Sequence, residues 1–208
     1  MDSTENIDIV LASASPRRKQ LLEEAGVRFR VQACPVDETL GPDAASCPEE
    51  AAKALAEKKA GAAVQEILVQ KPQGTTVVIG ADTIVVLEGE IFGKPRSLSD
   101  AKRMLRRLSG NTHQVITAVS VWIIAAPEPE KVSIGRKTFA DTSAVSFKPL
   151  TDDEIADYLR KGESFDKAGA YAAQGAGADL IAKVEGDLDT VIGLPVRKLL
   201  QEFPDLRR

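Results

Sequence analysis

The sequence predicts an α/β fold in which a mixed β-sheet is flanked by helices. Two kinds of pattern lead to this prediction: strand-loop-helix units, which build parallel strand pairs, and long alternating stretches, which build antiparallel hairpins. The chain has 208 residues, enough for one sizeable core or for two lobes that meet at a cleft, and too few for two full domains. We therefore treat residues 1–208 as a single domain.

The first strand-loop-helix unit lies near the start of the chain. Residues 7–12 are almost continuously apolar, which indicates a strand buried on both faces. Ser15 is a suitable N-cap for the next helix, Pro16 suits its first position, and Gly26 is a natural stop. Apolar and polar residues then alternate over residues 27–32, which predicts a half-buried strand.

The middle of the chain mixes helices with hairpins. An alanine-rich pattern with interspersed Lys and Glu predicts a helix over residues 48–69. A strand over residues 76–81 follows, and Asp82 comes directly after it. Residues 84–87 and 91–92 flank a Glu-Gly-Glu turn and are expected to form a hairpin that places Lys94 near its far end.

The second half of the chain continues this alternation. A capping signal at residues 97–100 opens a helix that ends at Gly110, and another at residues 151–154 opens a helix that ends at Gly162. Between them, two long alternating stretches, residues 115–124 and 132–147, should pair as antiparallel strands. The small, glycine-rich residues 167–175 indicate a loop that approaches a ligand closely, and a last strand and helix follow.

Composition excludes several classes of function. A net charge of -4 argues against broad binding to nucleic acid. The two cysteines and the single histidine cannot complete a zinc site with ordinary spacing. His113 is also the only residue that could serve a Ser/His/Asp triad, and its place favours the start of a strand. Without a secretory signal or an apolar run long enough for a membrane, we expect a cytoplasmic protein.

The segment from Ser13 to Arg18 is a candidate phosphate site. Arg17 and Arg18 fall in the first helical turn, where the helix dipole disfavours each cation by about 0.3–1 kcal/mol. An anion bound there would reverse this penalty, because free N–H groups, the hydroxyls of Ser13 and Ser15 and both guanidinium groups could donate to it. An exposed basic face with Ser15 acting only as a cap is the alternative, and this segment alone does not decide between them.

Acidic residues in the first half of the chain suggest a magnesium-type site. Asp82 follows a buried strand, where many α/β proteins open a ligand crevice, and Glu38 lies beyond the strand predicted for residues 27–32. Mg²⁺ prefers oxygen ligands and substrate phosphates, and Asp82 could orient or deprotonate a water molecule. The alternative is that each acid only caps a turn. Lys59 and Lys94 could clamp phosphates, but their chemistry alone does not distinguish them from solvent-facing lysines.

Several segments together resemble the Maf family of nucleotide pyrophosphatases, from about Val10 to Pro195. The resemblance is carried by residues 13–18, 37–38, 57–60, 80–83, 93–95, 108–110, 167–175 and 193–195. It implies an elongated molecule of the Maf and inosine triphosphatase type, with two lobes around a central cleft. It also implies a divalent metal, Mg or Mn, cleavage between the α and β phosphates, and frequent homodimers.

The same resemblance assigns roles to individual residues. Asp82 matches the proton acceptor of the family, whereas Arg17, Thr83 and Gln174 match positions that govern substrate selectivity. Further pocket positions correspond to Glu38, Lys59 and Lys94. The run ending in Gln174 is similar to the branch that acts on dTTP and UTP, and a Gln amide can both donate to and accept from the edge of uracil or thymine.

Two functional hypotheses remain open at this point. The first is metal-dependent hydrolysis of dTTP, UTP and modified pyrimidine nucleotides to the monophosphate and pyrophosphate. The second is a non-catalytic module that senses a nucleotide and regulates a partner or a fused domain. The chain also resembles the amino-terminal domain of acetylserotonin O-methyltransferase-like proteins, in which a methyltransferase domain follows, so an origin as one domain of a longer protein is a further expectation.

Overall fold

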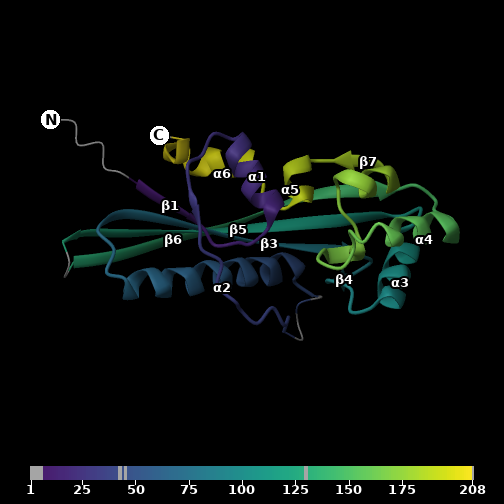
Figure 1. Ribbon diagram of the computed structural model, residues 1–208, viewed down its shortest axis with the longest axis horizontal. Helices are drawn as coiled ribbons and strands as arrows, with labels where there is room; N and C mark the ends of the chain where they lie inside the picture. The colour runs from purple at the N-terminus through teal and green to yellow at the C-terminus, as the bar shows by residue number, and fades with distance from the viewer. Residues whose placement is uncertain (1–6, 42–43, 45, 129–130, 208) are drawn as a thin grey trace.

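The computed structural model describes residues 7–41, 44, 46–128 and 131–207, and they form an elongated molecule around one sheet (Figure 1). The strands are β1 (Ile7–Leu11), β2 (Arg30–Val31), β3 (Gly74–Leu87), β4 (Glu90–Phe92), β5 (Thr112–Glu128), β6 (Lys131–Phe147) and β7 (Ile181–Glu185). The α-helices are α1 (Pro16–Glu24), α2 (Pro48–Val69), α3 (Leu98–Leu108), α4 (Asp152–Arg160), α5 (Leu188–Ile192) and α6 (Val196–Glu202). Short 3-10 helices are η1 (Ala168–Ala170), η2 (Gly175–Leu180) and η3 (Pro204–Arg207).

The sheet is mixed, which confirms the predicted fold class. Its described strands follow the order β2-β1-β3-β5-β6-β7, and β4 pairs with the far part of β3. β1 is parallel to both β2 and β3, whereas every other pair is antiparallel. β3, β5 and β6 are therefore the long central strands, and the shorter strands flank them at the two ends of the molecule.

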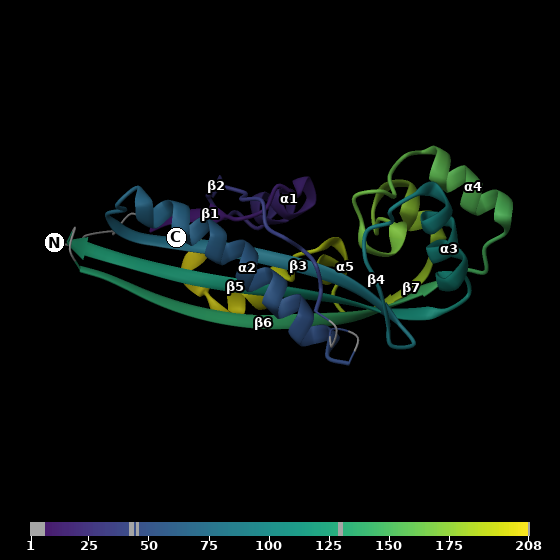
Figure 2. The same ribbon diagram turned by 90° about the horizontal axis from the view of Figure 1, so that it is seen from below.

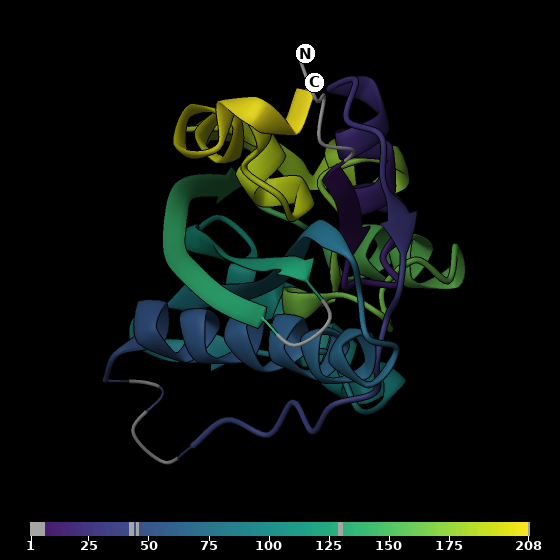
Figure 3. The same cartoon turned by 90° about the vertical axis from the view of Figure 1, so that its left-hand side faces the viewer.

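Helices cover both faces of the sheet (Figures 1 and 3). On one face lies α2, whose Ala60, Ala63 and Ile67 pack against Val78 of β3. On the other face lie α1, α5 and α6, where Leu22 and Leu199 belong to one buried cluster with Ile79. We call this part of the molecule, built on β1 and covered by α1, α2 and α6, the proximal lobe.

A second lobe surrounds the far ends of the long strands. It contains β4, β7, α3, α4 and η1, and we call it the distal lobe (Figure 2). Phe92, Leu105 and Tyr158 contribute to its separate hydrophobic core. His113 is buried here, with Nε2 2.8 Å from the hydroxyl of Tyr171, so its predicted place in a strand is confirmed. None of the helices among the described residues is both long and apolar enough to cross a membrane.

The capping residues predicted the starts of α1, α3 and α4 correctly. Ser15 accepts a hydrogen bond from the amide of Arg18 at the start of α1, and Ser97 accepts one from Asp100 at the start of α3. Thr151 and Glu154 form the complete capping box predicted for α4. The interior face of α3 also matches its apolar pattern, since Ala101, Met104, Leu105 and Leu108 are buried.

Three predictions of local structure were wrong. The strand expected over residues 27–32 is reduced to β2, and Val31 is 48% exposed because no described strand pairs with the outer edge of β2. The strand expected to end before Asp82 continues through it to Leu87, because β5 pairs with β3 along the whole length. Two helices, α5 and α6, follow β7 instead of one, since Gly193 and Pro195 interrupt the helical pattern.

Candidate active site

A cleft lies beside β3 where one edge of this strand has no neighbour among the described strands. β1 pairs with β3 as far as Ile79, and β4 pairs with it only from Val85 onward. Among the described strands, none covers residues 80–84 on this edge. A cleft of about 680 Å³ opens there, and segments of both lobes line it.

The cleft brings together most of the site residues predicted from the sequence. Its lining includes Ser13, Ser15, Arg17, Arg18, Glu38, Lys59, Asp82, Thr83 and Lys94. Because neighbouring residues of a strand point to opposite faces, Asp82 and Thr83 reach the cleft from opposite sides of the sheet. Asp82 faces α2, where it contacts Lys59, and Thr83 faces α1, where it contacts Arg18.

Arg18 is a structural centre of the phosphate-site candidate. Its Nε donates to the carbonyl of Gly193 over 2.8 Å, its Nη1 to Ser13 Oγ over 3.2 Å and its Nη2 to Thr83 Oγ1 over 3.1 Å. Burial lowers the pKa of the Arg18 guanidinium, although the nearby Asp82 opposes this effect. Arg18 thus links α1, β3 and the turn after α5, and much of its hydrogen-bonding capacity is already used.

Arg17 differs from its neighbour in this respect. It is half-buried and lines the cleft, and within the described ranges no residue forms a hydrogen bond or ion pair with its guanidinium group. The N-terminus of α1 lies at the same place, so the amide groups of the first turn and a free guanidinium face one region. This combination suits an anionic group such as a phosphate.

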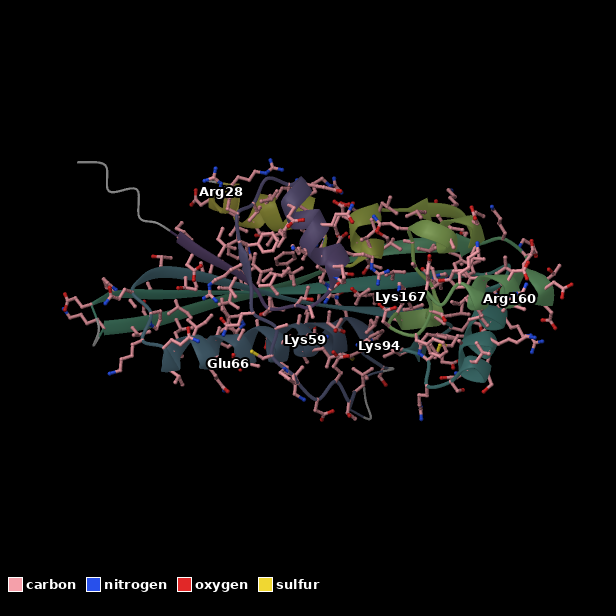
Figure 4. The ribbon with its side chains drawn as sticks, viewed as in Figure 1. Arg28, Lys59, Glu66, Lys94, Arg160 and Lys167 are labelled. Atoms are coloured by element: carbon pink, nitrogen blue, oxygen red, sulfur yellow. The ribbon has the colours of Figure 1, made fainter. Side chains whose placement is uncertain are left out.

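An alternating chain of charges crosses the other side of the cleft. Lys59 Nζ lies 2.5 Å from Asp82 Oδ1 and 2.8 Å from Glu38 Oε1. Glu38 Oε2 in turn lies 2.8 Å from Lys94 Nζ. Figure 4 shows Lys59 and Lys94, from α2 and from the segment after β4, in the middle of the molecule. Partial desolvation raises the pKa of Glu38, but hydrogen bonds and charges from both lysines outweigh it and lower the pKa to about 2.

Gly80 explains how Lys59 can reach Asp82. A Cβ atom on Gly80 would lie 2.7 Å from the carbonyl oxygen of Ala56 and 2.7 Å from the amide nitrogen of Ala60. Contacts this short do not occur in folded proteins, so only glycine allows α2 to pack directly on β3 here. The close approach places Lys59, the neighbour of Ala60, within reach of the carboxylate two residues after Gly80.

The acidic pair is compatible with one divalent cation. Glu38 and Asp82 present an oxygen each to the same ammonium group, so both carboxylates border one small volume beside the cleft. Mg²⁺ in nucleotide enzymes commonly uses one or two carboxylates and completes its shell with water and substrate phosphates. No group of three or more acidic, histidine or cysteine ligands occurs among the described residues, so the pair alone would not enclose a metal.

Two residues from the segments that carry the family resemblance lie apart from this arrangement. Gln174, at the start of η2, is not part of the cleft lining, although its neighbour Ala173 is. Asp37 is 71% exposed and binds Thr39 and Lys58, because β2 ends too early to hold it at the end of a strand. The role of Gln174 stays a prediction.

Other lining residues were not selected from the sequence. Asp166 and Lys167 form an ion pair at the rim contributed by the distal lobe, and Lys167 is labelled in Figure 4. The only signal for them was the glycine-rich composition that begins at residue 167. Thr117 of β5 contacts the hydroxyl of Thr83, but no sequence pattern could have identified it. Alternation predicts a strand and does not show which residue of another strand lies opposite.

Comparison with known proteins places these observations in a family. The family described as Maf-like protein matches residues 8–206. A protein of Bacillus velezensis named dTTP/UTP pyrophosphatase is 45% identical over 197 residues, which cover 95% of each chain. A protein of the same name from Geotalea uraniireducens is 46% identical and covers 91% of this chain and 90% of that protein.

Among solved structures, the Ham1 protein of Staphylococcus aureus aligns with a TM-score of 0.46 and 15% identity, over 97% of this chain and 100% of that chain. The family match extends over nearly the whole sequence and includes every segment that lines the cleft. The chain belongs to the Maf family of proteins.

Proposed function

We propose that the protein hydrolyses pyrimidine nucleoside triphosphates, dTTP and UTP above all and modified relatives with them, to the monophosphate and pyrophosphate. The observation that carries this proposal is the meeting of Asp82, Lys59 and the Ser13–Arg18 segment in a single cleft. The names of relatives about 45% identical along the whole chain support the same reaction.

The proposed reaction begins at Asp82. Its carboxylate accepts a proton from a water molecule, whose oxygen then forms a bond to the α-phosphorus of the substrate. The bond from that phosphorus to the oxygen bridging the α and β phosphates breaks, and its electron pair leaves with pyrophosphate. Lys59 holds Asp82 Oδ1 in place over 2.5 Å, so the carboxylate is oriented before substrate binds.

The remaining groups bind and neutralise the phosphates. Arg17, the first turn of α1 and Ser13 supply donors on one side, and Lys94 supplies a cation on the other. Glu38 and Asp82 would hold a divalent cation, Mg²⁺ or Mn²⁺, which when bound neutralises phosphate charge. Gln174 would read the pyrimidine edge from the distal lobe once a substrate occupies the cleft.

Incubation with dTTP or UTP and Mg²⁺ or Mn²⁺ tests this function. Release of pyrophosphate and the monophosphate is expected, whereas release of orthophosphate alone would place the cleaved bond elsewhere. Tight nucleotide binding by calorimetry without any product would favour the alternative, a nucleotide-sensing module.

Three further properties belong to the same proposal. We expect a homodimer, a cytoplasmic location and, in a longer protein, a methyltransferase domain that follows this one. The resemblance to the Maf family supports the first, and the resemblance to the amino-terminal domain of acetylserotonin O-methyltransferase-like proteins supports the third. The location is the expectation drawn from the sequence. Light scattering on the purified chain measures the first, and fractionation and full-length transcripts of the source organism test the other two.

A further inference from the structure

Arg18 imposes a direction on the hydrogen bonds around it. A guanidinium group donates and cannot accept. Ser13 Oγ, 3.2 Å from Nη1, and Thr83 Oγ1, 3.1 Å from Nη2, must therefore both be acceptors toward Arg18. Each of these hydroxyls keeps one proton, and the neighbouring groups determine where that proton points.

The proton of Thr83 is directed away from the cleft. Thr83 of β3 and Thr117 of β5 are register partners, and their hydroxyl oxygens lie 2.9 Å apart. Thr117 Oγ1 also lies 2.6 Å from the carbonyl oxygen of Thr190, which can only accept. Thr117 has one proton and gives it to that carbonyl, so Thr83 must donate to Thr117.

Burial fixes this direction. Thr117 and Thr190 are both 0% exposed, so water cannot replace either partner. Reversing the Thr83–Thr117 bond would leave the Thr190 carbonyl without its donor in the interior, at a cost typical of unsatisfied buried groups. The hydrogen bonds therefore run in one sense, from Arg18 through Thr83 and Thr117 to Thr190. Thr83 can offer the cleft only a lone pair.

The hydroxyl of Ser13 differs from that of Thr83, because it keeps a proton that it can donate into the cleft. Its Oγ accepts from Arg18 Nη1 and, over 3.3 Å, from the amide of Ser15. Two accepted hydrogen bonds occupy both lone pairs of a hydroxyl, so its proton remains to donate. Two hydroxyls on one guanidinium thus present different chemistry to the cleft: a donor at Ser13 and an acceptor at Thr83.

We propose that this difference orients the substrate, with Thr117 as the positioning residue that sets it. Ser13 donates to a phosphate oxygen, and the remaining lone pair of Thr83 accepts from an N–H or O–H donor of the nucleoside. A phosphate oxygen at Thr83 would place two hydrogen-bond acceptors next to each other with no proton between them. The donor is either the 3′-hydroxyl of the sugar or the N3–H of uracil or thymine, and in the second case Gln174 contacts only the neighbouring carbonyl oxygens of the base. This inference rests on the proposed function, because it assumes a nucleoside triphosphate in the cleft.

The experiment compares three nucleotides on four variants and the wild type. Cytosine lacks the N3–H and dideoxythymidine triphosphate lacks the 3′-hydroxyl, so kcat/KM is measured for dTTP, dCTP and dideoxy-TTP. Thr117→Val removes the acceptor for the Thr83 proton, which can then turn toward the cleft. We expect the preference of the wild type for dTTP over one of the two analogues to fall at least about fivefold. Thr117→Ser, which keeps the hydroxyl, should restore the wild-type preference.

The controls separate selectivity from stability. Thr76→Val makes the same exchange at a buried threonine of β3 that does not line the cleft, and it should leave both preferences unchanged. If Thr117→Val does not fold, Thr83→Val removes the acceptor itself, and the same preference should fall.

Each outcome has a defined meaning. A fall in the preference over dCTP identifies the base as the donor, and a fall in the preference over dideoxy-TTP identifies the sugar. The inference is overturned if both preferences persist in folded Thr117→Val or, where that variant does not fold, in Thr83→Val. It is also overturned if Thr76→Val lowers them equally. If no pyrophosphate is released at all, the proposed function fails, and ratios of dissociation constants from calorimetry on the same proteins still test the polarity of Thr83.

Discussion

Lys59 Nζ and Asp82 Oδ1 lie 2.5 Å apart across the contact between α2 and β3. The pair is mostly buried, and it joins two residues 23 positions apart in the sequence. This contact orients the carboxylate proposed to accept a proton from water. Its removal should therefore lower kcat more than it weakens substrate binding.

Asp82→Asn keeps the shape of the side chain and removes its basicity. Pyrophosphate release from dTTP should fall by about 10²- to 10⁴-fold, the usual contribution of a general base, while the dissociation constant for dTTP in calorimetry changes much less. Asp157→Asn, at an exposed position of α4, is the matched control and should retain wild-type turnover. Full turnover by Asp82→Asn would show that another group accepts the proton.

Gly80→Ala tests the close packing of α2 on β3. The added Cβ must push Ala56 and Ala60 away, so the free energy of unfolding should fall by about 1–3 kcal/mol in urea titrations. The displacement also moves Lys59 from Asp82, and kcat should decrease in the folded variant. Gly135→Ala, where nothing lies within 4 Å of the new atom, should change neither quantity. Equal stability of the two variants would contradict the packing argument.

Arg17 and Arg18 should respond differently to replacement by alanine. Arg17→Ala removes a guanidinium that no described residue binds, so kcat/KM should fall about ten- to hundredfold with little loss of stability. Arg18→Ala breaks its bonds to Ser13, Thr83 and Gly193 and should lower the free energy of unfolding by about 1–3 kcal/mol. Thermal melts and steady-state kinetics on both variants measure the contrast. The same loss of stability in both would remove the distinction.

Gln174→Glu replaces an amide that can donate and accept by a group that only accepts. If Gln174 reads the pyrimidine, the carboxylate faces carbonyl oxygens of the base, and kcat/KM for dTTP and UTP should fall about tenfold. Gln65→Glu adds the same charge on the exposed side of α2 and serves as the control. An unchanged preference among triphosphates would remove Gln174 from the site.

His113 should make stability depend on pH. Burial lowers its pKa to about 4, below the ordinary value of 6.5, so the unfolded chain binds a proton more readily than the folded one. The stabilisation is complete above pH 6.5 and is lost as the pH falls toward 4, by about 2 kcal/mol between pH 7 and pH 5. In His113→Gln, which removes the only histidine, the unfolding free energy should vary less over this interval. An identical pH dependence in both proteins would argue against a buried neutral imidazole.

The sequence predicted well those features that depend on neighbouring residues. The starts of α1, α3 and α4 follow from side chains that cap amides within three positions, so no tertiary information was needed. The course of β3 was harder, because a charged residue at position 82 looks like the end of a strand unless its partner is known. Long-range pairing with β5 overrode that local signal.

The site residues likewise divide into those that local sequence could identify and those that depend on how distant segments pack. Chemistry alone selected Asp82 and the Ser13–Arg18 segment, but it could not distinguish Lys59 or Lys94 from solvent-facing lysines. Only the family resemblance singled them out, because the Gly80 contact and the ion pairs with Glu38 depend on how distant segments pack. Likewise, no local signal separates Arg17 from Arg18. The fold turns Arg18 toward Ser13, Thr83 and Gly193, whereas the Arg17 guanidinium has no hydrogen bond or ion pair with any described residue.

The two lobes are not joined by a linker, since β3, β5 and β6 run through both of them as 14-, 17- and 17-residue strands. Rocking one lobe against the other would bend three hydrogen-bonded strands at once, so closing the cleft by a hinge between the lobes would be costly. Side chains and the rim segments at residues 33–40 and 166–173 can adjust to a substrate without bending the sheet. The fold therefore favours a preformed nucleotide-binding cleft over one that closes by a hinge after the nucleotide binds.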